Sequence, residues 1–480
     1  MEARKTEKSI RKDINVKVII AILVFSGLVA TFNETILNVA LSTLMSEMNV
    51  TAGVIQWIIT AYMIVVAVLV PVTAFLIQTF NTKQLYLTAM TILLIGTISA
   101  IFSESFTMLL LSRILQAAGT GMIIPIMMNT VLAVAPAKSR GLVMGLCGAA
   151  LTLGPALGPT VAGVVLQRHS WHVLFMILIP IIILAIAFGS IYLVNVSNIT
   201  KPKLDVISIL LSSLGVGGFI YGISSIGGST KIKMVGIIFA IGIISLILFC
   251  KRQLSLKQPM LNLSTFKYPI FTMGTLLVML SMMTIFTMAV MLPMFLQEGL
   301  GTTTFVAAMT LLPATLISGI MTPIGGKIYD KLGEKILLPI GFAIILIPLF
   351  LLARSSHDAS IMSIILLFIV VDIGVAFTMS PSQTTALSTL PKEYYPHGVA
   401  ILNTLQQLAA AIGSSLFIGI MSASQLKALS KQVSGQAAAA TGFNSATLVL
   451  CIFVLAGLIL SLILSVVDKN DSKLSNPECA

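Results

Sequence analysis

Residues 445–467 read SATLVLCIFVLAGLILSLILSVV, a stretch of 23 residues without a charged side chain. A helix of this length crosses the hydrocarbon core of a bilayer, which is about 30 Å thick. Working outward from it, thirteen other apolar stretches of spanning length lie near residues 18–41, 54–77, 85–102, 106–134, 142–166, 173–197, 207–226, 233–249, 270–296, 303–325, 336–353, 359–381 and 398–421. The sequence therefore predicts an all-α polytopic membrane protein with 14 transmembrane helices.

The composition leads to the same class. Hydrophobic residues make up 57% of the 480 residues and charged residues only 9%, whereas a soluble domain carries about 25% charged residues. This excludes a cytosolic enzyme, a nucleic-acid-binding module and a disordered regulator. The apolar runs are continuous rather than alternating, which excludes a membrane β-barrel. The four cysteines are scattered, with no spacing typical of a metal site or a disulfide framework.

Lysine and arginine in the loops orient the spans, because cytoplasmic loops carry an excess of both. With the N-terminus inside, 21 of the 28 basic residues fall on the cytoplasmic side, six fall outside and Arg113 lies within a span. Both termini are therefore predicted to be cytoplasmic. The basic N-terminal run is interpreted as a topology determinant that contacts anionic lipid, and no nucleic-acid partner is expected.

An internal repeat divides the spans. The turns at residues 74–83 and 326–335 lie 252 residues apart, and so do the spans that begin near residues 18 and 270. Transporters are frequently built from such repeats, with the substrate site between the halves. The predicted organisation is a basic N-terminus at 1–17, a six-helix bundle at 18–197, two extra spans with linkers at 198–269, a second six-helix bundle at 270–467 and a cytoplasmic tail at 468–480.

Four stretches resemble motifs of the major facilitator superfamily. GKIYDKLGEK at 326–335 is similar to its cytoplasmic signature, and RILQAAGTG at 113–121 agrees with its fourth helix. NETILNVAL at 33–41 and GAALTLGPALGPTVAG at 148–163 resemble the helix-1 motif and the antiporter motif of fourteen-span drug:proton antiporters of the EmrB/QacA type. The chain is identified as a member of that family and resembles its lincomycin-resistance-like multidrug exporters.

The resemblance implies a major facilitator fold with 6+2+6 helices and a multi-pass exporter in the plasma membrane of a bacterium. In such exporters two bundles rock around a central site, and inward proton flow drives outward flow of amphipathic or cationic antibiotics, dyes or biocides. The proton gradient is the energy source, and no cofactor or metal is expected. The expected partners are drugs, protons and membrane lipid, and the chain is expected to act as a monomer.

Gating residues are carried over from the same motifs. Asp330, beside Lys331, is expected to latch the cytoplasmic gate when the cavity opens outward; the alternative is a helix cap without a switching role. In the antiporter motif at 148–163, prolines remove backbone donors and bend the helix, while glycines let neighbouring helices approach closely. Its gating residues are Gly154, Pro155, Gly158 and Pro159. The alternative is an ordinary proline-kinked span.

Two positions depart from the family pattern. The first cytoplasmic turn has Gln78 and Thr79 where the family has an aspartate and an arginine, so the second turn, with Asp330, is expected to carry more of the switch. The helix-1 motif has Asn33 where aspartate is usual. The acid follows one residue later, at Glu34, about 100° around the helix.

Glu34 and Asp372 are the acids that lie clearly within spans. An ionisable group in hydrocarbon is costly unless it faces a cavity or a partner, and a carboxyl shielded from water takes up a proton more readily. We expect Glu34 about 10 Å below the outer end of the span at 18–41 and close to Arg113, which would stabilise its carboxylate until substrate or a conformational change separates them. The alternative is that Glu34 reaches outer water and Arg113 only ties loops or carbonyls.

Asp372 is expected near the middle of the span at 359–381, where the repeat places it opposite Thr120. Each half would then contribute one protonatable group to a shared cavity. The alternative is a buried aspartate that bonds serine or threonine hydroxyls for packing.

The substrate-binding candidates are polar or adaptable side chains within the spans. They include methionines, whose thioethers fit many apolar ligand shapes, although packing is the favoured explanation for most methionines of the span at 270–296. Trp57 with Gln56 is equally explained as an interfacial anchor, and the amides as bonds to a neighbouring helix. The set is Asn33, Asn38, Gln56, Trp57, Gln116, Met279, Met283, Phe286, Asn403 and Gln407. No metal or proton-relay role is expected for His169, His172, His357 and His397, which lie at loops or span ends.

Other functions stay open. The chain is alternatively an exporter of a physiological metabolite, lipid or siderophore. A polytopic enzyme acting on lipid would need a catalytic dyad at the interface, and the sequence offers no phosphate loop, zinc-protease motif or nucleophile elbow; an enzyme is therefore not expected. A non-transporting scaffold would have no use for charged residues within its spans.

Overall fold

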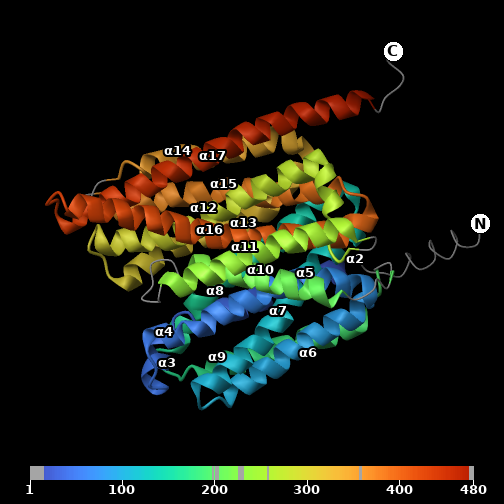
Figure 1. Cartoon of the computed structure of the whole chain (residues 1–480), viewed down its shortest axis with the longest axis horizontal. Coiled ribbons are helices and arrows are strands. Elements are labelled where there is room, and N and C mark those ends of the chain that lie inside the picture. Colours follow the sequence, from blue (N-terminus) through green and yellow to red (C-terminus); the bar gives the residue numbers. More distant parts are fainter. Residues whose placement is uncertain are drawn as a thin grey trace, which may run out of the picture.

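The computed structural model describes residues 16–196, 199–200, 205–224, 232–256, 259–355 and 359–474. Every regular element in those residues is a helix, and 14 helices are long and apolar enough to cross a membrane. The predicted number of spans is confirmed. Figure 1 shows long helices running side by side, with the described ends of the chain, in α2 and α17, at the same end of the molecule. The basic segment 1–15, residues 475–480 and His357 lie outside the described residues.

The first six spans form the N-terminal bundle, and two short helices follow its first span. The spans are α2 (Val16–Thr35), α5 (Trp57–Thr79), α6 (Thr82–Ile101), α7 (Phe106–Val134), α8 (Arg140–Val165) and α9 (His172–Tyr192). The short helices α3 (Leu41–Glu47) and α4 (Ala52–Ile55) lie at the end of the molecule opposite the chain ends (Figure 1).

The last six spans form the C-terminal bundle, and two spans stand between the bundles. The inserted spans are α10 (Val206–Ser224) and α11 (Ile232–Ser255), and the bundle contains α12 (Pro269–Glu298), α13 (Thr304–Leu332), α14 (Glu334–Leu352), α15 (Ile361–Ser388), α16 (Tyr395–Leu429) and α17 (Gly435–Leu474). Corresponding helices pack in the same pairs: α6 on α7 as α14 on α15, and α2 on α8 as α12 on α16. Short 3-10 turns η1 (Ala137–Ser139), η2 (Leu263–Lys267) and η3 (Lys392–Tyr394) precede α8, α12 and α16.

Several span boundaries differ by six or more residues from their predicted positions, and the first and last spans show how such differences arise. The first span, expected to reach residue 41, ends at Thr35, and a series of turns carries the chain to α3. The last span begins at Gly435, ten residues before its apolar stretch, because four alanines at 437–440 form helix well without being strongly apolar. Hydrophobicity marks the part of a helix inside the bilayer, whereas helix propensity and local bonds set its ends.

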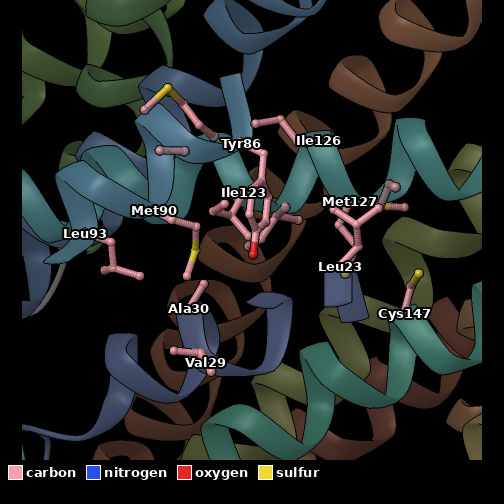
Figure 2. Packing of buried hydrophobic residues seen from close by; sticks show 14 of the residues in the cluster. Leu23, Val29, Ala30, Tyr86, Met90, Leu93, Ile123, Ile126, Met127 and Cys147 are labelled. Carbon is pink, nitrogen blue, oxygen red and sulfur yellow. The ribbon is translucent and has the colours of Figure 1, made fainter. Parts of the chain in front are cut away.

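The core of the N-terminal bundle is largely apolar, and one of its buried polar side chains is Tyr86. Figure 2 shows Tyr86 of α6 among side chains of α2 and α7. Its hydroxyl lies 2.7 Å from the Ser26 Oγ and donates to the Ala185 main-chain oxygen at 3.0 Å. Gly27 lets α2 approach α7, since a Cβ there would meet the sulfur of Met127. A buried tyrosine whose hydroxyl is bonded ties three helices together.

The two bundles meet along α8 and α13, beginning at one end of the molecule. A Cβ on Gly141 or Gly326 would collide with the main chain of the other, so only glycine permits this approach. The contact continues to mid-helix, where Gly319 packs on Leu153. Beyond that point Gly154 of α8 faces α2 instead, where a Cβ would meet Thr31. The bundles are therefore locked together at the end where α8 begins.

Candidate functional site

Arg113 is the centre of a buried polar network in the N-terminal bundle. It lies in α7 and is fully buried. Its Nη1 donates to the main-chain oxygen of Asn33 at 2.9 Å and to the Gln116 Oε1 at 2.8 Å, and its Nη2 donates to the main-chain oxygen of Glu34 at 2.8 Å. Carbonyls in the last turn of a helix lack intrahelical partners. The guanidinium supplies partners to α2 where that helix ends.

Tyr62 of α5 completes the network, and the sequence analysis did not single it out. The Arg113 guanidinium stacks over the Tyr62 ring at 4.1 Å. The Tyr62 hydroxyl lies 2.7 Å from the Thr120 Oγ1 and accepts from the Asn33 Nδ2 at 3.3 Å. A tyrosine near the start of a largely apolar span, as Arg113 is near the start of α7, was the available signal. The network thus joins α2, α5 and α7.

Two atoms of the network have hydrogen-bonding capacity left over. The Asn33 Oδ1 and the Arg113 Nε are buried without a hydrogen-bond partner among the described residues. One is an acceptor and the other a donor. Gln116 continues the network in the other direction, since its Nε2 donates to the Thr97 Oγ1 at 3.4 Å. The site therefore retains a free donor and a free acceptor beside Tyr62.

Glu34 lies nearer to the end of its helix than expected. Because α2 ends at Thr35, Glu34 is one residue from that end rather than about two turns below it, and its side chain is only half-buried. Arg113 reaches its main-chain oxygen, and no ion pair joins the two side chains in the part of the chain that the structure describes. The structure brings the two residues together through the backbone, and the Glu34 carboxyl is left without a salt bridge.

Asp372 lies well inside α15, the helix that corresponds to α7, and it is buried. Its main-chain oxygen accepts from the Ser318 Oγ of α13 at 3.2 Å. Among the described residues, no hydrogen bond or ion pair reaches its carboxyl group. Neighbouring hydroxyls therefore do not hold the carboxyl in the way that the packing alternative requires.

Asp330 spans the contact between the bundles. It lies in the last turn of α13, and its two carboxylate oxygens accept from the main-chain amides of Gly141 at 2.7 Å and Leu142 at 2.9 Å. Those amides open α8, where unpaired donors and the helix dipole favour an anion. The adjacent Lys331 is exposed. A single carboxylate thus clamps the C-terminal bundle to the N-terminal bundle.

The prolines of α8 lie inside a continuous helix that packs on α2. Pro159 has no N–H, so the carbonyl of Pro155 loses its helical partner. The Thr35 Oγ1 of α2 donates to that carbonyl at 3.5 Å. A Cβ on Gly158 would press on the same threonine. The motif therefore serves as a close, hydrogen-bonded contact between α8 and α2.

The other substrate-binding candidates are spread over the molecule. Trp57 stacks on Tyr221 of α10, with ring centroids 5.6 Å apart. The Asn403 Nδ2 donates to the Val399 main-chain oxygen at 2.9 Å and contacts the Met128 sulfur at 3.3 Å. Met283 is buried against Gly413, Met279 is half-buried and Gln56 is exposed. Asn38 is exposed, and Phe286 and Gln407 are half-buried. No hydrogen bond joins these residues to the Arg113 network within the described ranges.

The histidines that can be placed do not form a cluster. His397 is buried at the start of α16, where its Nδ1 accepts from the main-chain amide of Asn262 at 3.3 Å. His172 stacks on Trp171. In the described residues, no group of three or more histidine, cysteine or acidic side chains is placed to hold a metal ion.

Two similarly packed six-helix bundles, with two spans inserted between them, a buried arginine network in one bundle and a clamp that joins both, define a polytopic membrane transporter. The chain belongs to the Major Facilitator Superfamily, whose family model matches residues 23–414. It is therefore a multi-pass membrane transporter and not an enzyme, as the sequence predicted.

Two known proteins are similar to the chain in sequence, and a solved structure is similar to it in fold. It is 41% identical over 406 residues to the lincomycin resistance protein LmrB of Bacillus subtilis, covering 84% of this chain and 85% of that protein. It is 26% identical to the riboflavin transporter RibZ of Clostridioides difficile, over 83% of this chain and 87% of that protein. The crystal structure of the human organic anion transporter MFSD10 shares the fold, with a TM-score of 0.63 at 12% identity over 93% of this chain and 99% of that one.

Proposed function

We propose that the chain is a proton-coupled antiporter that exports amphipathic or cationic drugs from a bacterial cell by alternating access. The observation that carries the proposal is the Arg113 network beside Glu34, in a chain 41% identical to a lincomycin resistance protein. In this proposal the protein works as a monomer in lipid, without a cofactor, and both termini are cytoplasmic.

In that orientation the end at which α8 begins is cytoplasmic, and the structure corresponds to a transporter closed toward the cytoplasm. Asp330 and the paired Gly141 and Gly326 hold that end shut. Opening toward the cytoplasm requires both carboxylate bonds to break. Asp330 thereby acts as the latch, and the antiporter motif at 148–163 keeps α8 fixed to α2 while the bundles rock.

The Arg113 network gives each component a distinct task. The guanidinium is held by main-chain oxygens and Gln116, so its position does not depend on the charge of Glu34. The Glu34 carboxyl remains free to exchange its proton for a cationic substrate. The free Asn33 oxygen and Arg113 Nε offer a ligand an acceptor and a donor. Asp372 supplies a second carboxyl from the other bundle.

The test is transport of ethidium, lincomycin and several other antibiotics into the lumen of energised everted vesicles, where export from the cytoplasmic face is measured as uptake, with and without a collapsed pH gradient. Glu34→Gln and Asp372→Asn are each expected to reduce gradient-driven transport by at least about tenfold, because each removes one protonatable group. Glu104→Gln, an exposed acid in the loop before α7, is the matched control and is expected to transport normally. Full gradient-driven efflux by Glu34→Gln would remove that residue from the mechanism.

Export of a physiological metabolite is the second candidate, and the similarity to a riboflavin transporter supports its inclusion. Riboflavin therefore belongs in the same vesicle panel. Transport of riboflavin without transport of any drug would favour the metabolite function over drug export.

A further inference from the structure

The inserted helix α10 lies across the seam between the bundles. It packs on α5 of the N-terminal bundle and on α16 of the C-terminal bundle, whereas α11 packs mainly on α10. A small apolar cluster marks the seam and contains Ala67 of α5, Val216 and Ile220 of α10, and Ala411 of α16. Any rocking of the bundles must therefore shift α10 against at least one of its two neighbours.

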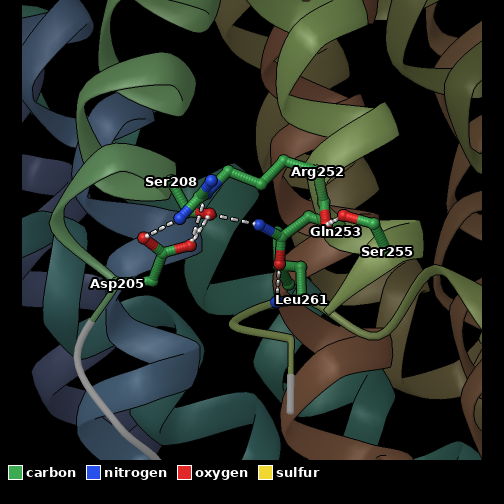
Figure 3. Close-up of polar contacts among 6 residues, drawn as sticks. All are labelled: Asp205, Ser208, Arg252, Gln253, Ser255 and Leu261. Atoms are coloured by element: carbon green, nitrogen blue, oxygen red, sulfur yellow. Dashed lines mark hydrogen bonds and ion pairs between the residues drawn. The ribbon is translucent and has the colours of Figure 1, made fainter. Parts of the chain in front are cut away.

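Polar contacts make the two inserted helices one unit at the end where α10 begins. The Arg252 Nε and Nη2 donate to the two carboxylate oxygens of Asp205 at 2.8 and 2.9 Å, and the Ser208 Oγ donates to the same carboxylate at 2.6 Å (Figure 3). Two-point arginine–carboxylate pairing fixes geometry as well as distance. The start of α10 and the end of α11 are thus held in a fixed relation.

The same chain of bonds continues into the C-terminal bundle. The Gln253 Nε2 donates to the Ser208 Oγ at 2.6 Å, and the Gln253 Oε1 accepts from the main-chain amide of Leu261 at 3.0 Å (Figure 3). The next amide, of Asn262, donates to the Nδ1 of His397 in α16. Buried, directional bonds of this kind resist sliding, because breaking one leaves a polar group unpaired.

The contact with the N-terminal bundle is of another kind. Gly217 presents no side chain to α5, where a Cβ would lie 3.3 Å from the Ile64 Cγ2 and 3.8 Å from the Val68 Cγ2. At the opposite end Trp57 stacks on Tyr221. The linker before α10 does touch α5, through the Thr200 amide and the Gln78 main-chain oxygen. Within the described ranges, however, no hydrogen bond or ion pair joins α10 or α11 to α5.

We propose that α10 and α11 move as part of the C-terminal bundle, and that α10 slides along α5 as a wall that keeps the α5–α16 seam closed to lipid. The α10–α5 contact consists of apolar side chains and a glycine, so α10 can shift along α5 without breaking a hydrogen bond. A shift of α10 and α11 against the C-terminal bundle would break the hydrogen bonds that join them to it. The inference rests on the alternating opening that the proposed function requires.

The experiment compares two reversible cross-links in a background without the native cysteines. Ile64→Cys with Gly217→Cys joins α10 to α5, and Ile220→Cys with Ala411→Cys joins α10 to α16. The readout is hydrogen–deuterium exchange at the amides of Gly141 and Leu142, which are bonded to Asp330 in the closed form and exchange when that end opens. It needs no substrate, so failure of drug efflux is distinguishable from failure of this inference.

The α10–α5 cross-link is expected to slow this exchange about tenfold, because exchange takes place in the open form and the link prevents the molecule from reaching that form. Reduction of the cross-link is expected to restore the exchange. The α10–α16 cross-link should leave the exchange unchanged within about twofold. Normal exchange with α10 linked to α5, or arrest with α10 linked to α16, would overturn the proposal.

A substitution tests the sliding surface without a cross-link. Gly217→Leu should slow the same exchange, since the added side chain engages α5, while Gly236→Leu, on α11 with no neighbour within 4 Å of its added Cβ, should not. Equal effects of the two variants would contradict a sliding contact at Gly217.

Discussion

Replacing Asp330 with asparagine should open the molecule at the end where α8 begins, which the proposed orientation places in the cytoplasm. The side chain keeps its size, but one of its two acceptor oxygens becomes an NH₂ group that faces another N–H donor. One of the two bonds to the start of α8 is therefore lost, and the other is no longer charge-assisted. Both bonds exist only while the bundles are closed, so their loss shifts the equilibrium between the closed and open forms.

The size of the shift follows from those two bonds. A hydrogen bond to a charged group contributes about 1.5–3 kcal/mol, and a charge at a helix N-terminus about 0.3–1 kcal/mol. Hydration of the freed amide in the open form offsets part of this, which leaves about 2 kcal/mol. At about 1.4 kcal/mol for each factor of ten, the ratio of open to closed molecules should rise about 30-fold while the closed form predominates.

The assay is the rate at which a hydrophilic maleimide outside everted vesicles labels Ser380→Cys, with the native cysteines replaced; in the proposed orientation the reagent meets the cytoplasmic face. Ser380 is fully buried in α15 and faces Gly148 of the other bundle, so a cysteine there is reached only when the bundles part. Lys331→Gln is the control, because it changes the neighbouring exposed charge and leaves the clamp intact. A change of less than about threefold in the Asp330→Asn background, which corresponds to well under 1 kcal/mol, would refute the clamp.

Three further variants test other contacts. Tyr62→Phe removes a buried hydroxyl with two polar contacts and should lower the free energy of unfolding by about 1 kcal/mol, seen as a lower melting temperature in detergent. Gly154→Val should prevent assembly of α8 on α2, whereas Gly163→Val, which has no neighbour within 4 Å of its added Cβ, should give normal yield on size-exclusion chromatography. The partner arginine lowers the pKa of Asp205 to about 2, so its bond stabilises the protein fully above about pH 4 and is lost as the pH falls toward 2; the melting-temperature difference between wild type and Asp205→Asn should therefore be constant from pH 8 to about 5 and shrink below 4.

The number and order of the spans could be predicted from the sequence, because crossing a bilayer requires an apolar length that each segment carries by itself. The repeat was visible for a similar reason, since both copies keep the same short turn between long helices. The end of α2 was not predictable in this way. The stretch after Thr35 is still apolar, and the helix stops where Arg113, 78 positions further along the chain, binds the carbonyls of its last turn.

The sequence predicted several residues of the candidate site, but it did not predict the contacts between them. Charge within a span pointed to Glu34, Arg113 and Asp372, but an ion pair was the natural expectation for an acid and a base at similar depth. In the structure the guanidinium instead donates hydrogen bonds to main-chain oxygens. Every residue has a main-chain carbonyl, so the sequence does not indicate which of them will bind an arginine. Tyr62 was missed because a tyrosine among aliphatic residues resembles core packing until the cation above its ring is seen.

This arrangement decides how the neutralising variant should be interpreted. If Arg113 were held by the Glu34 carboxylate, Glu34→Gln would release a buried cation, and loss of transport would report a damaged bundle. Because Arg113 is held by two main-chain oxygens, by Gln116 and by the Tyr62 ring, the same substitution leaves every one of its contacts in place. Glu34→Gln should therefore melt at the wild-type temperature, and any loss of gradient-driven efflux in that variant will report the missing proton.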